Sequence, residues 1–289
     1  MKRLFCCLLA ASMLLSVLSG CGNSTAETDS VDTLLLATTQ PMYELTEQII
    51  AGAAGITVQP LIQDQVSCLH DYTITTDQMK KIERADLVIL SGAGLEDFMA
   101  SSLSGKDTAD VIDSSEGIAL LDDDPHIWLD PRRYVQQGEN ITKALSERYP
   151  EQADLFEKNM AAYEDMLLEQ YQNNWYPAAQ SLSCKELITF HDGFAYFADA
   201  YGLTILAAIE EEEGAEPSAA ELKEIVELTE AHKIPMIFTE KNGATNAAEI
   251  VAQETGVKTG VLDLGMSGGE NSYASVMDAN LEALKAGLK

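Results

Sequence analysis

The stretch 67–90, SCLHDYTITTDQMKKIERADLVIL, combines a loop that contains His70, an amphipathic segment and an apolar run. Helical spacing of the apolar residues after Thr75 predicts a helix over 75–85, with Thr75 as its N-terminal cap. The segment 86–94, DLVILSGAG, shows no alternation with polar residues, which is typical of a strand buried on both faces of a sheet. A helix that leads into such a strand predicts a parallel sheet with helices packed against it.

The same alternation occurs on both sides of this stretch and resumes after a helical middle. It predicts strands at 31–39, 55–62, 184–190, 203–209, 235–240 and 258–264. We therefore expect an α/β fold of two lobes with parallel sheets, an N-terminal lobe at 31–150 and a C-terminal lobe at 179–289. The apolar stripe from Glu151 to Tyr176 predicts one helix of roughly 39 Å. We interpret 151–178 as a rigid linking helix between the lobes, with a long core helix of a single domain as the alternative.

The first residues have the features of a bacterial secretion signal. A basic start and an apolar run too short to span a membrane predict a signal peptide over 1–20. The signal ends in LSGC, which resembles the lipobox of bacterial lipoproteins and predicts lipidation of Cys21. The alternative is an ordinary signal followed by a chance cysteine. With 21–30 as a polar tether, we expect a protein that is lipid-anchored to the cell membrane and faces outside the cytoplasm.

The mature chain would be strongly acidic. The whole sequence has 18 Lys and Arg residues against 47 Asp and Glu residues, and removal of the signal leaves 16 basic residues, a formal charge of −31. Nucleic acid is therefore excluded as a partner, because phosphate binding requires a basic surface. A field of this sign favours cations instead.

Three of the four histidines fall at loop positions of the predicted fold. His191 directly follows a strand, His70 lies in the loop after another strand, and His126 precedes a helix. Asp263 and Glu240 close two further strands. Because ligands bind at the carboxyl ends of strands in open α/β sheets, we expect three imidazoles and one carboxylate to converge in the cleft between the lobes. Such a set suits zinc and tolerates manganese, and the pattern leaves the choice between Asp263 and Glu240 open.

The remaining histidine and two cysteines are not assigned to this site. His232 ends a predicted helix, where the helix dipole favours partial positive charge. Cys68 lies beside His70, whereas Cys184 begins the strand that leads to His191. If His70 and His191 bind the same metal ion, Cys68 lies near one end of that strand and Cys184 at the other. The strand spans roughly 23 Å, whereas a disulfide needs Cα atoms within about 7 Å. We therefore expect no stable disulfide between the two cysteines.

Five segments of the chain carry a resemblance to a known family. They are HDYTITTDQMKKIERADLVILSGAGLE (70–96), DPHIWLDP (124–131), FHDGFAYFADAYGL (190–203), EPSAAEL (216–222) and LDLGMSGGENSYASVMDANLEAL (262–284). From about Thr33 to Leu288, the sequence resembles the zinc- and manganese-type solute-binding lipoproteins of bacterial ABC importers.

This resemblance implies one metal ion bound between two lobes by His70, His126, His191 and Asp263. From the strand pattern, we retain Glu240 as a supporting residue or an alternative ligand. It implies a protein that is not an enzyme, captures zinc outside the cytoplasm and delivers it to the membrane permease of an ABC importer. Manganese is the alternative cargo. Zinc-type members tend to have histidine at the position of His191, and imidazole favours zinc over manganese. We expect a monomer.

Some features depart from the family or leave other functions open. Where many zinc-specific members have a histidine-rich loop, this chain has Asp122–Asp124, and a second acidic run, Glu210–Glu213, follows a strand on the edge of the predicted site. We interpret both runs as solvated loops, with cation attraction or permease contact as the alternative. A secreted zinc hydrolase with Glu240 as its base is a rival function, but the sequence has no HExxH motif. An adhesin is a second rival, since surface lipoproteins of this resemblance have been described in that way.

Overall fold

The computed structural model of the chain describes residues 32–66, 69, 72–210, 217–266 and 272–289. The predicted signal peptide, Cys21, Cys68, His70 and Glu211–Glu213 lie outside these ranges. The residues from Thr33 to Lys289 form one compact unit. None of the helices in the described ranges has the length and apolar character needed to cross a membrane.

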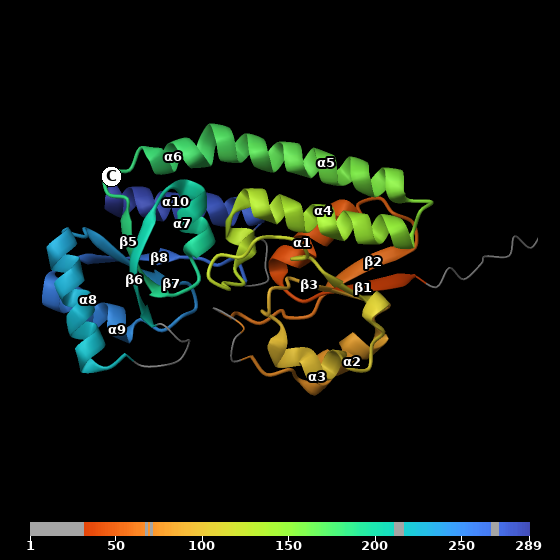
Figure 1. The fold of residues 1–289 in the computed structure, drawn as a ribbon, viewed down its shortest axis with the longest axis horizontal. Coiled ribbons are helices and arrows are strands. Elements are labelled where there is room, and N and C mark those ends of the chain that lie inside the picture. Colours follow the sequence, from red (N-terminus) through yellow and green to blue (C-terminus); the bar gives the residue numbers. More distant parts are fainter. Residues whose placement is uncertain (1–31, 67–68, 70–71, 211–216, 267–271) are drawn as a thin grey trace, which may run out of the picture. The chain divides into compact units, whose positions relative to one another are not determined.

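The first lobe is built on a parallel sheet with the strand order β2-β1-β3-β4. Its strands are β1 (Thr33–Ala37), β2 (Ile56–Pro60), β3 (Leu87–Leu90) and β4 (Val111–Asp113). Its helices are α1 (Gln40–Ile49), α2 (Thr76–Arg84), α3 (Ala100–Leu103) and α4 (Pro131–Arg148), with 3-10 turns η1 (Asp97–Met99), η2 (Thr108–Asp110) and η3 (Ile127–Leu129). In Figure 1, α1 and α4 cover one face of the sheet and α2 and α3 cover the other. Cover on both faces explains why β1 and β3 are apolar without alternation.

The second lobe repeats this plan with the strand order β6-β5-β7-β8. Its strands are β5 (Glu186–His191), β6 (Thr204–Glu210), β7 (Met236–Glu240) and β8 (Lys258–Leu262), and its helices are α7 (Ala195–Tyr201), α8 (Ala219–His232), α9 (Asn246–Thr255) and α10 (Tyr273–Leu288). Leu187 and Ile188 are neighbours in β5 but belong to different apolar clusters, because successive strand residues face opposite sides of a sheet. The predicted fold of two α/β lobes with parallel sheets is confirmed.

The connection between the lobes is helical but not one regular helix. It consists of α5 (Ala153–Gln170), a π-helical turn η4 (Tyr171–Trp175) and α6 (Tyr176–Gln180). The sequence predicts an uninterrupted helix here. Pro177 explains the difference, because it has no N–H to donate to the carbonyl of Asn173 and its ring would clash with that carbonyl in an α-helix. The wider turn also directs both Tyr171 and Trp175 into the core, where each is less than 10% exposed.

The connecting segment is attached to both lobes. In the first lobe, Asn159 of α5 donates hydrogen bonds of 2.9 Å to the carbonyl oxygens of Ile49 and Ala51. In the second lobe, the hydroxyl of Tyr171 donates a bond of 2.6 Å to the carbonyl oxygen of Ala200. Figure 1 shows the segment running past α4 and α10, two of the helices that it contacts.

The lobes also contact each other through aromatic side chains. Tyr134 of α4 stacks on Tyr273 of α10, with ring centroids 4.0 Å apart and an interplanar angle of 18°. The Tyr273 hydroxyl donates to the carbonyl oxygen of Trp128 at 2.8 Å, and Trp128 Nε1 donates to the carbonyl oxygen of Leu264 at 2.7 Å. These residues belong to a single apolar core that extends through both lobes.

Candidate metal centre

His191 lies at the carboxyl end of the second sheet. The sequence predicts it just after a strand, whereas the structure makes it the last residue of β5, where it is in register with Glu210 of β6. Its side chain is almost fully buried, at 5% exposure. β5 lies between β6 and β7, so His191 is held by an interior strand at the edge where α/β proteins bind ligands.

His126 is fully buried and is oriented by a neighbouring carboxylate. Asp124 Oδ1 accepts a hydrogen bond of 2.9 Å from the backbone N–H of His126 and lies 2.6 Å from His126 Nδ1. A carboxylate at Nδ1 stabilises the tautomer with its proton on Nδ1, which places the lone pair of the ring on Nε2. Asp124 is only 10% exposed, so the interpretation of Asp122–Asp124 as a wholly solvated run is wrong for its last residue.

The imidazoles of His126 and His191 lie against each other. Their ring centroids are 5.4 Å apart, and the rings meet edge to face at 79°. Gly193 makes this approach sterically possible. A Cβ atom at that position would lie 2.8 Å from His191 Cδ2 and 3.0 Å from His126 Cε1, closer than side chains tolerate. The two predicted ligands are thus brought together from segments far apart in the sequence.

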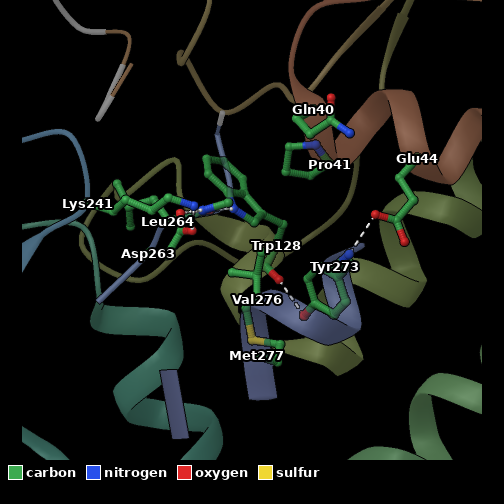
Figure 2. Close-up of a pocket in the computed structure, with 11 residues that line it drawn as sticks. Gln40, Pro41, Glu44, Trp128, Lys241, Asp263, Leu264, Tyr273, Val276 and Met277 are labelled. Atoms are coloured by element: carbon green, nitrogen blue, oxygen red, sulfur yellow. Dashed lines mark hydrogen bonds and ion pairs between the residues drawn. The ribbon is translucent and has the colours of Figure 1, made fainter. Parts of the chain in front are cut away.

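Asp263 immediately follows β8, and its position is fixed by several hydrogen bonds. The side chain of Asn280 accepts from the backbone N–H of Asp263 and donates to its carbonyl oxygen, both at 2.8 Å. Asp263 Oδ1 accepts from the backbone N–H of Gly265 at 2.8 Å, and Oδ2 lies 2.6 Å from the ammonium nitrogen of Lys241. Figure 2 shows this ion pair beside Trp128, whose ring is 5.3 Å from that of His126.

The structure does not gather all predicted ligands at one point. Within the described residues, no three His, Cys, Asp or Glu side chains lie close enough to hold a metal ion. Two of the four predicted ligands are in contact, and Asp263 is engaged with Lys241. His70 lies outside the described residues. Glu240 ends β7 and is 5% exposed, directly before Lys241 in the chain.

The pocket drawn in Figure 2 adjoins Asp263. It is lined by Gln40, Pro41, Glu44, Trp128, Lys241, Asp263, Leu264, Gly265, Tyr273, Val276 and Met277. Glu44 accepts hydrogen bonds from the backbone N–H of Tyr273 at 2.6 Å and from the hydroxyl of Tyr163 at 2.8 Å. Burial raises the pKa of Glu44. This carboxylate therefore ties α1 to α5 and to the first residue of α10.

Two residues that the sequence leaves outside the site are also described. His232 is the last residue of α8, as predicted, and its Nδ1 lies 3.1 Å from a carboxylate oxygen of Glu186. Cys184 forms no disulfide with any of the described residues. Because Cys68 is not among the described residues, the absence of a disulfide stays a prediction.

Sequence reasoning missed three residues that shape the site: Asp124, Gly193 and Lys241. Asp124 and Gly193 stand within DPHIWLDP and FHDGF, so their proximity in sequence to His126 and His191 was a usable signal. Lys241 had no such signal, because its contact with Asp263 depends on the order of strands in the sheet.

Known proteins resemble this chain over most of its length. It is 31% identical over 309 residues to the zinc-binding lipoprotein AdcA of Streptococcus pneumoniae (strain ATCC BAA-255 / R6). This alignment covers 96% of this chain and 60% of AdcA. It is 30% identical over 311 residues to the high-affinity zinc uptake system protein ZnuA of Bacillus subtilis (strain 168). This alignment covers 97% of this chain and 96% of ZnuA. This chain thus spans about three fifths of the length of the first of these relatives.

A solved structure is similar in fold as well as in sequence. The Zn(II)-bound ZnuA-like domain of Streptococcus pneumoniae AdcA matches with a TM-score of 0.75 and 32% identity, over 89% of this chain and 99% of that chain. The model of the family described as "Zinc-uptake complex component A periplasmic" (ZnuA) matches residues 35–287. Since the match covers nearly all of both lobes, the chain belongs to this family of zinc-uptake components.

Proposed function

We propose that this protein binds a divalent transition metal outside the cytoplasm, with zinc as its cargo, and delivers it to the membrane permease of an ABC importer. The observation that carries the proposal is the contact between the buried imidazoles of His126 and His191 at the carboxyl end of β5. Imidazole nitrogens are typical ligands of zinc. Membership of the zinc-uptake family supports the same cargo.

The proposed ligands are His70, His126, His191 and Asp263. Three imidazoles and one carboxylate give zinc the tetrahedral set that it prefers. Asp124 supports this role of His126, because it fixes the ring tautomer. Glu240 is the alternative to Asp263, since it ends the strand next to β8.

A transport role distinguishes this protein from a hydrolase. A catalytic zinc keeps one coordination position open for water, whereas a fourth protein ligand at Asp263 would close the site. We therefore propose that the protein is not an enzyme. Zinc-loaded protein should show no activity in a screen of ester, peptide and phosphate substrates.

We further propose that the chain is anchored through a lipid on Cys21 and acts as a monomer beside its permease. The lipobox-like LSGC supports the anchor, and the name of the relative AdcA, a zinc-binding lipoprotein, points the same way. Cells fed a fatty-acid analogue should label the wild-type protein and not the Cys21→Ala variant. Equal labelling of both would contradict the anchor.

The test of the proposed function is the metal content of protein purified without added metal. Wild-type protein should contain about one zinc ion per chain, and His191→Ala should lose most of it. His232→Ala is the matched control, because it removes a half-exposed histidine of the same lobe and should leave the zinc content unchanged. Wild-type protein without bound metal, even after incubation with zinc, would contradict the proposal.

A further inference from the structure

The contact between Lys241 and Asp263 follows from the topology of the second sheet. β7 and β8 are parallel neighbours, and their register pairs Glu240 with Leu262 at the carboxyl end. Lys241 and Asp263 are the first residues after β7 and β8. The backbone N–H of Lys241 continues the ladder by donating to the carbonyl oxygen of Leu262 at 2.8 Å. Both side chains therefore leave the sheet at the same level, and their charged ends meet at 2.6 Å.

Only one oxygen of this carboxylate faces the lysine. Oδ1 accepts the backbone N–H of Gly265, and the Asn280 side chain holds the Asp263 backbone on both sides. Asn280 itself is 1% exposed, so the backbone that carries the Asp263 carboxylate is held in a fixed position. Asp263 is 16% exposed and Lys241 36% exposed, which makes the ion pair partly buried and less screened than one on the surface.

We propose that Lys241 sets the metal specificity of the site by competing with the cargo for Asp263. This inference rests on the proposed function. The ammonium group holds Oδ2 in the metal-free protein, and a metal ion that takes Asp263 as a ligand must displace it. The Lys241 ammonium group thus competes with the metal ion for Asp263, and the pairing of β7 with β8 positions it to do so.

This competition affects two metals unequally. Three imidazoles alone already bind zinc strongly, so zinc keeps much of its affinity while Lys241 holds Asp263, although Asp263 completes the site in the final complex. Manganese prefers oxygen ligands and a higher coordination number, so it loses most of its affinity while the carboxylate of Asp263 is held by Lys241. Lys241 therefore weakens manganese binding more than zinc binding and widens the preference for zinc.

The variant Lys241→Met removes the charge and keeps a side chain of comparable length. Its affinity for manganese should rise about fivefold, as expected from loss of an ion pair of this exposure, and its affinity for zinc should rise by a smaller factor. Lys241→Arg keeps a cation and should bring no gain. Lys258→Met is the matched control, because it makes the same change in net charge at the exposed start of β8.

Affinities for zinc and manganese are measured by competition with a metal-binding dye, and thermal unfolding is measured without metal. If Lys241 had a purely structural role, Lys241→Met would lower the stability of the protein and its affinity for both metals together. Lys241→Gln is the second variant, to be used if Lys241→Met does not fold. An unchanged ratio of manganese to zinc affinity in Lys241→Met, or an equal change in Lys258→Met, would overturn the inference and leave the proposed function standing. Wild-type protein that binds neither metal would overturn both.

Discussion

The imidazole rings of His126 and His191 lie edge to face with their centroids 5.4 Å apart, although one ring belongs to the loop before η3 and the other to the end of β5. The contact joins a segment that leads into α4 of the first lobe to the central part of the second sheet. Both rings are buried, so little room exists for either to move. Small changes around the pair should therefore alter metal binding more than they alter the fold.

Gly193→Ala is the most direct change of this kind. The added methyl group would lie 2.8 Å from His191 Cδ2 and 3.0 Å from His126 Cε1, so at least one imidazole must move. We expect zinc affinity to fall about tenfold or more, since ligand position controls affinity. Gly105→Ala is the control, because a methyl group there meets no atom within 4 Å. Equal zinc affinities for both variants, measured by competition with a chelating dye, would contradict the proposed ligand pair.

Asp124→Asn tests how His126 is oriented. The amide of asparagine is a weaker acceptor for Nδ1–H than the carboxylate, so the ring loses part of what fixes its tautomer. Zinc affinity should fall about 10- to 100-fold. Asp122→Asn is a matched control in the same acidic run: Asp122 is exposed and its φ is 47°, a conformation that asparagine also adopts readily. A similar loss of affinity in both variants would indicate a general effect of charge instead.

The fold could be predicted well because its signals are local. Thr75 forms a capping box with Gln78 at the start of α2, and Gly202 ends α7 with a φ of 65°. Such residues mark helix ends in the sequence itself. The π turn at Tyr171–Trp175 was not predicted, because the apolar stripe continues through it and Pro177 indicated only where the helix would end.

The site was predictable only in part. Histidines at the carboxyl ends of strands indicated where a metal would bind, and the resemblance selected Asp263 over Glu240. The ion pair of Asp263 with Lys241 could not be predicted from the sequence, since it requires that β8 lie next to β7. The space left by Gly193 was also invisible, because a missing side chain matters only once its neighbours in space are known.

Glu96 should make stability depend on pH. Burial raises the pKa of its carboxyl from 4.5 to about 7, although Thr38 and the backbone N–H groups of Ser91 and Gly92 donate hydrogen bonds to it. The folded chain holds this proton more tightly than the unfolded chain. Its stabilising contribution is therefore complete below about pH 4.5 and is lost as the pH rises through about 7.

The variant Glu96→Gln cannot titrate at this position. Relative to the variant, the wild-type free energy of unfolding should fall by up to about 3 kcal/mol between pH 4.5 and pH 7. Urea unfolding at several pH values measures this difference. Glu83→Gln, at an exposed position of α2, should give a curve parallel to that of the wild type. Parallel curves for Glu96→Gln as well would show that the carboxyl titrates normally.

Metal binding should leave the arrangement of the lobes largely unchanged. The stacked rings of Tyr134 and Tyr273 connect the lobes through a shared apolar core, and Asn159 and Tyr171 attach the connecting segment at both ends. A flexible hinge of two or three strands would permit wide closure instead. Small-angle scattering of metal-free and zinc-loaded protein should give nearly equal radii of gyration. A decrease of several ångströms on zinc binding would contradict this prediction.

The last prediction is that zinc, with manganese as the alternative, is the cargo in cells, and it depends on His191. A third imidazole favours zinc, whereas a carboxylate at this position would favour manganese. Tight zinc binding in vitro is weak evidence, because almost any such site binds zinc more tightly than manganese. The short acidic loop at Asp122–Asp124 argues the other way, since it replaces a histidine-rich loop found in many zinc importers.

Deletion of the protein should impair growth under zinc chelation, and added zinc should restore growth. His232→Ala should complement the deletion and His191→Ala should not. Rescue by manganese alone, at constant zinc, would reassign the cargo to manganese.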